Sequence, residues 1–210
     1  MGATRSPPEF TDTTDVAVLD RQLALRTAPG PEGEEVRAAL REAIACKAHE
    51  FDAHGVEHNQ RYASGAVVAD GTPMPEYRRD PELYAQPTTW PGAKLPHTWV
   101  TRAGHRVPTL DLVGHGAFSV VTGVGGDDWL AAARAVGEEL GLTPTEVPIG
   151  PGLPYDDPYG TWAELRETGD AGVLLVRPDC YVAARHPGAP ASAEQAREWV
   201  RASLGAVLGR

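Results

Sequence analysis

Hydrophobic residues recur at helical spacing in three stretches of this chain. Residues 34–52 carry an apolar side chain about every 3.6 positions and acidic residues in the first turn, which predicts an amphipathic helix. Gly55 is the expected end of that helix. Residues 128–140 and the stretch after Ser192 show the same period. We expect Asp127 and Ser192 to cap these two helices, because a side-chain oxygen there accepts hydrogen bonds from unpaired backbone N–H groups.

Shorter apolar runs rich in β-branched residues are typical of buried strands. The expected extended segments are residues 95–100, 106–113, 117–124, 143–149, 172–176 and 181–184. Residues 162–167 predict a short helical turn. From residue 109 onward the order is strand, strand, helix, strand, helical turn, strand, strand, helix. A helix that links two strands, followed by an adjacent strand pair and a last helix, predicts an α/β protein with a thioredoxin-like fold.

Prolines and glycines divide the remainder of the chain. A Pro-Gly-Pro break at residues 29–31 follows a short apolar pattern, and the stretch 56–96 is rich in proline and has little period. A connector of that length is typical of a functional or surface-crossing segment. We therefore predict a polar tail with a short helical extension over residues 1–33. A helix with a long Pro-rich connector follows over 34–96, and a thioredoxin-like domain over 97–210.

Charge and composition exclude several partners. The formal net charge of -10 argues against nucleic acid and against anionic membranes as partners. The chain has no apolar run of about 18 residues, the length of a membrane span, and its start has no hydrophobic signal-peptide core. We therefore expect a cytoplasmic protein. Cys46 and Cys180 lie far apart and form no C-x-x-C motif, which argues against thioredoxin-type redox chemistry.

Five short segments together resemble one protein family. They read HGVEHNQRY at 54–62, DG at 70–71, PGAKLPHTW at 91–99, TLDL at 109–112 and LLVRPD at 174–179. From about residue 35 to residue 209, the chain resembles the C-terminal part of FAD-dependent aromatic hydroxylases, most closely the phenol and dichlorophenol hydroxylase type. The resemblance implies a thioredoxin-like domain that lacks the redox cysteines.

The flavin-binding part of that family is outside the resemblance. The family holds FAD with a Gly-x-Gly-x-x-Gly turn, whose glycines let the backbone approach the pyrophosphate. The nearest match here is GVGGDD at residues 123–128, where Asp128 replaces the last glycine and would repel a phosphate. We therefore expect no cofactor bound by this chain alone, and FAD only through a partner.

Two histidines and an aspartate are candidates for catalysis. His115 lies between two glycines after the expected strand 109–113. It is a candidate general base, because glycines let a ligand approach the backbone closely. Asp111 could orient it, and His97 in the turn after Pro96 is the second candidate base. The alternative interpretation is that His115 is a solvated residue in a turn.

Polar residues after the first long helix are candidates for ligand binding. Asn59, Arg61 and Tyr62 follow one another closely there, and Trp99 follows His97. We predict that they line a ligand site or a docking surface for an aromatic molecule. The alternative is an ordinary helix end, at which the arginine satisfies free carbonyl groups.

A histidine pair raises the question of a metal. His54 and His58 are four residues apart, a spacing that places two imidazoles on one helical face. We expect Gly55 to break the helix between them, and we predict no metal site.

Three functions are compatible with these features. In the first, the chain is the stand-alone tail domain of an aromatic-compound monooxygenase. It then acts in phenol or polyketide metabolism, either as a partner or scaffold for a separate flavin hydroxylase subunit or by self-association. This hypothesis predicts an exposed apolar face. In the second, it is a cofactor-free tailoring enzyme for an aromatic polyketide-like substrate, with His97, His115 or Arg61 pointing into a closed pocket. The third, a redox thioredoxin relative, lacks the cysteine pair. We favour the first, because a family tail that loses its catalytic half usually keeps its packing contacts before it gains chemistry, although function depends on sites rather than on folds.

Overall fold

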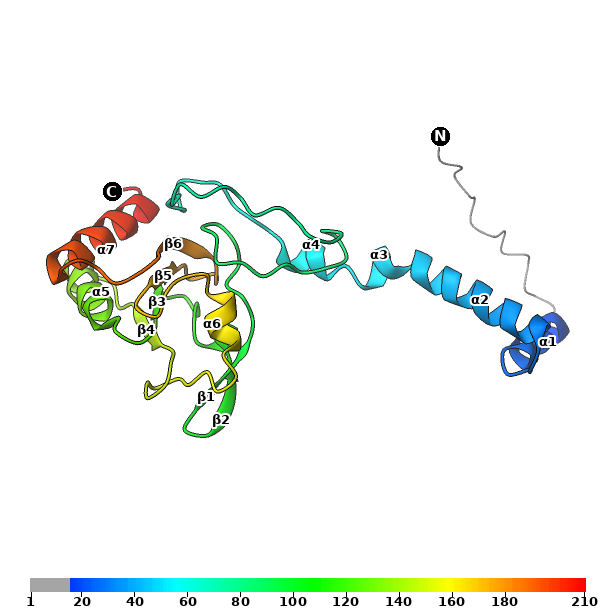
Figure 1. Cartoon of the computed structure of the whole chain (residues 1–210). Coiled ribbons are helices and arrows are strands. Elements are labelled where there is room, and N and C mark those ends of the chain that lie inside the picture. The colour runs from blue at the N-terminus through cyan, green and yellow to red at the C-terminus, as the bar shows by residue number, and fades with distance from the viewer. Residues whose placement is uncertain (1–15) are drawn as a thin grey trace. The chain divides into compact units, whose positions relative to one another are not determined.

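The computed structural model describes residues 16–210, which belong to two compact units, Met1–Asp52 and Ala53–Arg210 (Figure 1). The polar tail predicted over residues 1–15 lies outside the described residues. The boundary between the units falls inside the part that we predicted as helix plus connector. The division of the chain at residues 33 and 96 remains a prediction.

The first unit consists of helices. They are α1 (Val16–Leu25), α2 (Pro31–Cys46) and α3 (Ala48–Phe51). The single helix predicted over residues 34–52 was wrong at both ends. The helix starts earlier because Pro31 occupies its first turn, where a fixed φ and a missing N–H are tolerated. It is interrupted at Lys47, whose backbone N–H bonds to Ile44 three residues back, a tightening that is common at helix ends.

The second unit begins with α4 (His54–His58), and Gly55 lies inside this helix rather than ending the previous one. The Gly55 N–H donates to the carbonyl of Glu82 at 3.0 Å. A Cβ at this position would lie 2.0 Å from the carbonyl oxygen of Pro81. Gly55 is therefore required for close packing of α4 on the connector. The sequence pattern alone indicated only that a glycine there could end a helix.

The core of the second unit is a four-stranded sheet in the order β4-β3-β5-β6. β3 and β4 are parallel and are joined through α5 (Asp127–Leu140), and β5 is antiparallel to both β3 and β6. After β6 the chain forms α7 (Ala193–Leu208). This order confirms the predicted thioredoxin-like α/β layout. The strands are β3 (Ser119–Thr122), β4 (Thr145–Pro148), β5 (Val173–Val176) and β6 (Val182–His186).

Both faces of the sheet are covered. Successive strand residues point to opposite faces, so Val120 packs with α5 and α7, whereas Val121 belongs to a second cluster with Trp162 of α6 (Thr161–Leu165). α5 and α7 lie on one side of the sheet and α6 on the other (Figure 1). β3 and β5 are buried at every position, which explains their uninterrupted apolar sequence.

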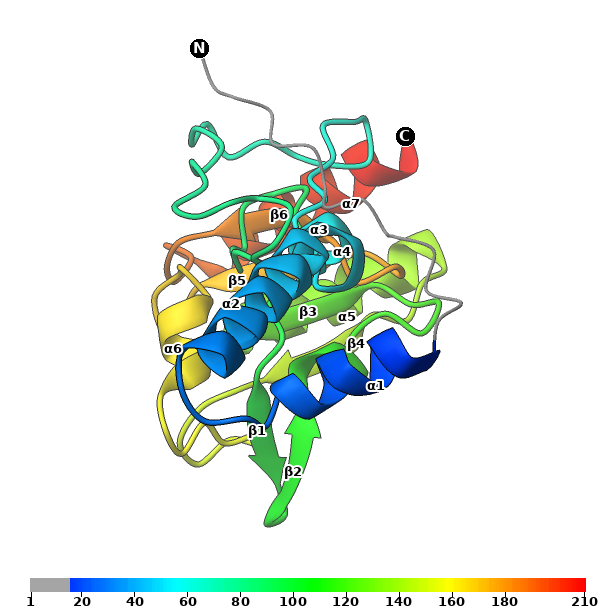
Figure 2. The ribbon, with the colours of Figure 1, turned by 90° about the vertical axis from the view of Figure 1, so that its right-hand side faces the viewer.

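The segment before the sheet differs from the prediction. Residues 95–113 form a hairpin of β1 (Trp99–Arg102) and β2 (His105–Pro108), which projects from this unit (Figure 2), and then a 3-10 helix, η1 (Thr109–Asp111). The expected strand over 109–113 was therefore wrong. The Thr109 hydroxyl donates to the carbonyl of Pro96 at 2.7 Å and accepts from the N–H of Thr98 at 3.0 Å. These bonds turn the chain where strand propensity would extend it.

The two predicted helix caps had different outcomes. Ser192 caps α7, because its hydroxyl accepts from the N–H of Gln195 at 3.1 Å. Asp127 is the first residue of α5, and Gly126 before it is the cap position without a side-chain bond. A Cβ at Gly126 would lie 1.9 Å from the Thr122 hydroxyl oxygen, so packing against β3 requires glycine there.

The connector is tied to the outer edge of the sheet. The N–H groups of Val68 and Gly92 donate to the carbonyls of Ala183 and Val182 in β6, at 2.7 and 2.8 Å. Within residues 16–210, no helix combines the length and the apolar character needed to span a membrane.

Candidate functional site

A cavity of about 310 Å³ lies beside α4, between the connector and the start of the β1–β2 hairpin. Its volume is near the lower end of the range of small-molecule sites. Most of its wall is apolar, and the contributing residues come from the connector and η1: Ala85, Pro87, Ala93, Leu95, Pro96 and Leu110.

The polar part of the cavity wall consists of hydrogen-bond donors and cations. Its main contributors are His54, His58, Gln60, Arg61, Lys94 and His97. None of the lining residues in the described part of the chain is acidic, although the chain has a formal net charge of -10. The fold therefore gathers the predicted residues His97 and Arg61 with His54, His58 and Lys94, which sequence reasoning did not place at a ligand site.

The Arg61 guanidinium is held in place on one side only. Its Nη1 donates to the carbonyl of Pro75 at 2.6 Å, and its Cζ lies 4.3 Å from the centre of the Tyr77 ring. Its Nη2 is buried and has no hydrogen-bond partner among the described residues. An unpaired buried cationic donor is costly to the fold.

The Asn59 side chain is fully used inside the connector. Its amide nitrogen donates to the carbonyls of Pro81 and Tyr84, both at 2.8 Å, and its oxygen accepts from the N–H of Gln86 at 2.7 Å. These bonds favour an architectural role for Asn59. Its predicted contact with a ligand is untested.

Tyr62 is exposed and packs edge-on against Tyr181, with 4.9 Å between the ring centres. Both hydroxyls donate to the side-chain oxygen of Gln60, at 3.2 Å from Tyr62 and 2.8 Å from Tyr181. Burial and the neighbouring Tyr62 raise the pKa of the Tyr181 phenol to about 12. Tyr62 therefore helps to position Gln60 at the cavity, but Tyr62 itself lies outside the lining.

Trp99 lies next to the cavity rather than in its wall. It is 46% exposed, its ring lies 5.5 Å edge-on from the His97 ring, and Arg106 stacks over it at 4.5 Å. These contacts place the Trp99 ring beside His97, and ligand binding by Trp99 stays a prediction.

His115 and Asp111 lie apart from the cavity lining. His115 is exposed and has a left-handed φ of 54° between two glycines that also have positive φ. Its Nε2 is 3.3 Å from the backbone carbonyl oxygen of Asp111, not from the carboxylate. Catalysis by His115, His97 and Asp111 stays a prediction, and the fold does not bring His115 and His97 into one cavity.

The histidine pair lies on one helical face after all, because Gly55 does not break α4. Ligand atoms of His54, Glu57 and His58 all lie within 4.8 Å of one another, and the two imidazoles are stacked with 6.5 Å between their centres. All three side chains are exposed. The group has the composition of a site for a divalent metal, and the prediction that the chain has no metal site is untested.

The two cysteines do not form a redox pair. Cys46 and Cys180 are both free thiols. Burial raises the pKa of the Cys180 thiol, which disfavours the reactive thiolate.

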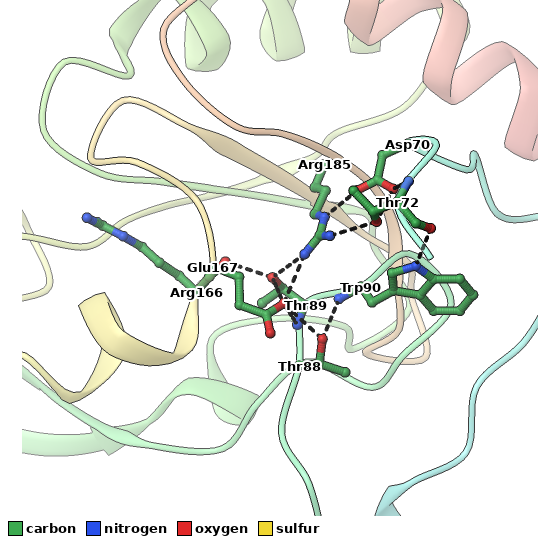
Figure 3. Close-up of polar contacts among 8 residues, drawn as sticks. All are labelled: Asp70, Thr72, Thr88, Thr89, Trp90, Arg166, Glu167 and Arg185. Carbon is green, nitrogen blue, oxygen red and sulfur yellow. Dashed lines mark hydrogen bonds and ion pairs between the residues drawn. The ribbon is translucent and has the colours of Figure 1, made fainter. Parts of the chain in front are cut away.

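Sequence reasoning missed a network that centres on Arg185 of β6 (Figure 3). The guanidinium contacts the carboxylates of Asp70 and Glu167, and it donates to the Thr72 hydroxyl at 3.1 Å. The only sequence signal was the Asp70-Gly71 pair in the resemblance, which gave no indication of its partners.

The other carboxylate of this network holds the end of the connector. One oxygen of Glu167 accepts from the Thr88 hydroxyl at 2.8 Å and from the N–H of Thr89 at 2.9 Å (Figure 3). Glu167 has a left-handed φ of 54°, a conformation that costs free energy in a residue other than glycine. The network fixes the connector that forms one wall of the cavity.

Comparison with known proteins gives the family. The profile described as aromatic-ring hydroxylase, C-terminal, matches residues 88–210. This chain belongs to that family. The match includes the whole four-stranded sheet and α5, α6 and α7, which pack on it, and it confirms the resemblance seen in the sequence.

Relatives of the aromatic-ring hydroxylase family extend the match to the connector. The chain is 48% identical over 171 residues to a 2,4-dichlorophenol 6-monooxygenase of Delftia acidovorans. The aligned segment covers 81% of this chain and 29% of that protein. It is 41% identical over 186 residues to a phenol 2-monooxygenase of Pseudomonas sp. (strain EST1001), and this alignment covers 89% of this chain and 31% of that protein.

A solved structure shows the same arrangement within a larger enzyme. The crystal structure of the flavin-dependent monooxygenase PieE in complex with FAD and substrate superposes with a TM-score of 0.72 and 45% identity. The superposition covers 90% of this chain and 32% of that one. The chain therefore spans less than a third of the length of these relatives.

Proposed function

We propose that this chain acts as the tail domain of an aromatic-compound monooxygenase, as a partner or scaffold for a separate FAD-containing hydroxylase subunit. The substrates of the assembly would be phenols or aromatic polyketides, and it would act in the cytoplasm. The chain spans less than a third of its flavin-dependent relatives, and the proposal assigns the flavin chemistry to the partner. Self-association of this chain is the competing form of assembly.

The observation that carries this proposal is the exposed apolar surface of the first unit. No residue of α1 is buried, and the buried residue of α2 is Gly33. A hollow of about 410 Å³ between the two helices is lined largely by apolar residues. The exposed large apolar side chains of these helices are Val16, Val18, Leu19, Leu23, Leu40 and Ile44.

Helices so poorly packed are marginal in water, and contiguous exposed apolar surface marks interaction sites. A flavin-containing subunit that covers α1 and α2 would supply the missing packing. An exposed apolar face is what a tail domain that packs on a flavin subunit would need, so these helices support the proposal.

The test is a mixing experiment. The full chain is run on a sizing column alone and with candidate flavin monooxygenases, and hydroxylation of a phenol or an aromatic polyketide is measured. We expect a yellow complex and hydroxylation that rises only in the mixture. Replacement of Leu23 and Ile44 by glutamate should weaken the complex at least tenfold, because a charge in an apolar interface is desolvated without a partner.

The matched control is Val124→Glu, which alters an exposed apolar residue of the second unit and should leave the complex intact. A chain that forms a colourless, self-contained dimer and never joins a flavin subunit would overturn the docking proposal.

A second candidate is a cofactor-free tailoring enzyme for an aromatic polyketide-like substrate. Its support is the presence of His97 and Arg61 in one cavity wall. The test of this candidate is an assay of the isolated chain with such a substrate in the absence of flavin and NAD(P)H. The substrate should be converted by the unaltered chain and not by His97→Gln. Conversion only in the presence of a flavin subunit would exclude it.

A further inference from the structure

We infer that the cavity beside α4 is a binding site for a small organic anion, with one carboxylate-sized charge on an apolar body. This inference does not depend on the proposed docking role, because it concerns ligand binding by the isolated chain. It rests on the charge of the cavity wall, on the fixed position of the Arg61 guanidinium and on the apolar character of the remaining wall.

The charge of the cavity wall is opposite to that of the chain. Arg61 and Lys94 line the cavity together with three histidines, and no described lining residue is acidic. In a chain with a formal net charge of -10, a concave surface without carboxylates is a local attractor for anions. The nearest carboxylate in α4, Glu57, lies 3.9 Å from the His58 Nε2 but is outside the lining.

Arg61 supplies a fixed positive charge for that anion. Its Nη1 is held by the carbonyl of Pro75, and its guanidinium lies over the Tyr77 ring, with 4.3 Å from Cζ to the ring centre. The guanidinium that lines the cavity is therefore oriented in advance. A carboxylate is the anion that suits such a group, since charge-assisted pairing with guanidinium is strong.

The rest of the wall selects the body of the ligand. Ala93, Leu95, Pro96 and Leu110 provide the apolar surface, which favours a ring or a short hydrocarbon over a heavily hydrated phosphate ester. The cavity volume of about 310 Å³ would be mostly unfilled by one acidic side chain of a partner protein. A small aromatic or aliphatic monocarboxylate matches both the charge and the space.

Benzoate is the probe, and binding to the full chain is measured by calorimetry and by NMR shifts of backbone amides, both without and with EDTA. We expect binding that shifts the amides of residues 60–62, 93–95 and 97. Benzyl alcohol has the ring without the charge, and acetate has the charge without the ring. Both should bind at least tenfold more weakly, because each lacks one of the two recognised features.

Arg61→Gln should weaken benzoate binding about tenfold or more, as expected for loss of a hydrogen bond to a charged group. Because Arg61 also contacts the connector, Lys94→Gln provides a second variant, which should weaken binding severalfold without loss of an internal contact of Arg61. The matched control is Arg134→Gln, which removes an exposed arginine paired with Glu146 and should bind benzoate like the unaltered chain.

Four results would overturn the inference. These are the absence of benzoate binding at tens of millimolar, equal binding of benzyl alcohol, unchanged affinity in folded Arg61→Gln, and binding that disappears in EDTA. The last result would assign the anion to a metal held by His54, Glu57 and His58. Complex formation with a flavin subunit is measured separately, so that docking and anion binding can fail independently.

Discussion

At the scale of single residues, Arg185 determines where the connector lies. Its side chain is 12% exposed and pairs with Asp70, which is 15% exposed, and with Glu167. Asp70 and Arg185 are 115 positions apart in sequence. Ion pairs at the surface contribute little to the free energy of folding. The pair of Arg185 and Asp70 is partly buried and has several further hydrogen bonds. Removal of one side chain therefore leaves the polar groups of the remaining ones unsatisfied.

Arg185→Ala should lower the free energy of unfolding by about 1–3 kcal/mol, because two carboxylates and two threonine hydroxyls lose their shared donor. Urea unfolding followed by circular dichroism measures the change. Arg201→Ala, which removes an exposed partner of Glu139, is the control and should change stability by less than about 0.5 kcal/mol. Equal effects of the two substitutions would contradict the central role of Arg185.

The Asp70 carboxyl should make part of this stability depend on pH. Burial alone would raise its pKa, but hydrogen bonds from Thr72 and Arg185 hold the pKa below the usual 3.8. A carboxyl with a lowered pKa in the folded state stabilises the fold above its usual pKa. That contribution is lost as pH falls through the lower, folded value.

Asp70→Asn should therefore be less stable than the unaltered chain at pH 7, by about 1 kcal/mol, and the difference should shrink as the pH falls below about 4. Urea unfolding of both proteins at pH 7 and below about pH 4 measures the difference in unfolding free energy. Asp20→Asn, which removes an exposed carboxylate of α1, is the control for the loss of one surface charge. A difference that stays constant down to pH 2 would refute the assignment.

At the scale of elements, α4 depends on a glycine. It is five residues long, too short to be stable by itself, and the backbone bonds from Gly55 and Val56 to the carbonyl of Glu82 hold it. Gly55→Ala should lower stability by about 1–3 kcal/mol and weaken benzoate binding, because its Cβ would lie 2.0 Å from the Pro81 oxygen.

The control for this substitution is Gly65→Ala, because a Cβ at Gly65 has nothing within 4 Å. Urea unfolding and benzoate titration are measured on both variants. If Gly65→Ala were the more damaging change, the proposed contact between α4 and the connector would be wrong.

The cap of α7 is the second element-level test. Ser192→Ala should cost about 1 kcal/mol of unfolding free energy, since an N–H of the first turn loses its acceptor. Ser192→Asp keeps an acceptor and should retain most of the stability. Thermal unfolding is measured for the unaltered chain, Ser192→Ala and Ser192→Asp. If Ser192 were a surface residue without a capping role, the two substitutions would have equal effects.

At the scale of the whole molecule, the two core clusters share one sheet. Val120 and Leu175 face the α5–α7 side, and Val121 and Leu174 face the α6 side. Leu204→Ala on the α7 side should therefore lower the unfolding free energy of the entire second unit by about 2–5 kcal/mol. The half-buried Leu208→Ala should cost less.

Amide hydrogen exchange in β3 and β5 reports on that cooperativity. Exchange should accelerate at residues of both faces in Leu204→Ala. Acceleration confined to the α7 side would mean that the clusters unfold separately.

The sequence predicted those parts of the fold whose pattern is local. The period of residues 128–140 and the apolar runs of β3 and β5 determined helix and strand identity, and the order of elements then determined the thioredoxin-like layout. Gly55 and the segment 109–113 were misassigned, because contacts with Pro81 and Pro96, distant in sequence, override the local preference there. Arg61 and His97 were selected as polar residues in the right segments, without knowledge that they share a wall.

By itself, the sequence determined the family, the α/β class and the absence of a C-x-x-C pair, because these depend on residue order and spacing alone. Only the tertiary structure decided that Lys94 and His54 join Arg61 at one cavity, and that Arg185 meets Asp70. The physical reason is that the cavity and the ion pair arise where the connector folds back on the edge of β6. That return depends on hydrogen bonds between residues far apart in the chain, which no periodicity records.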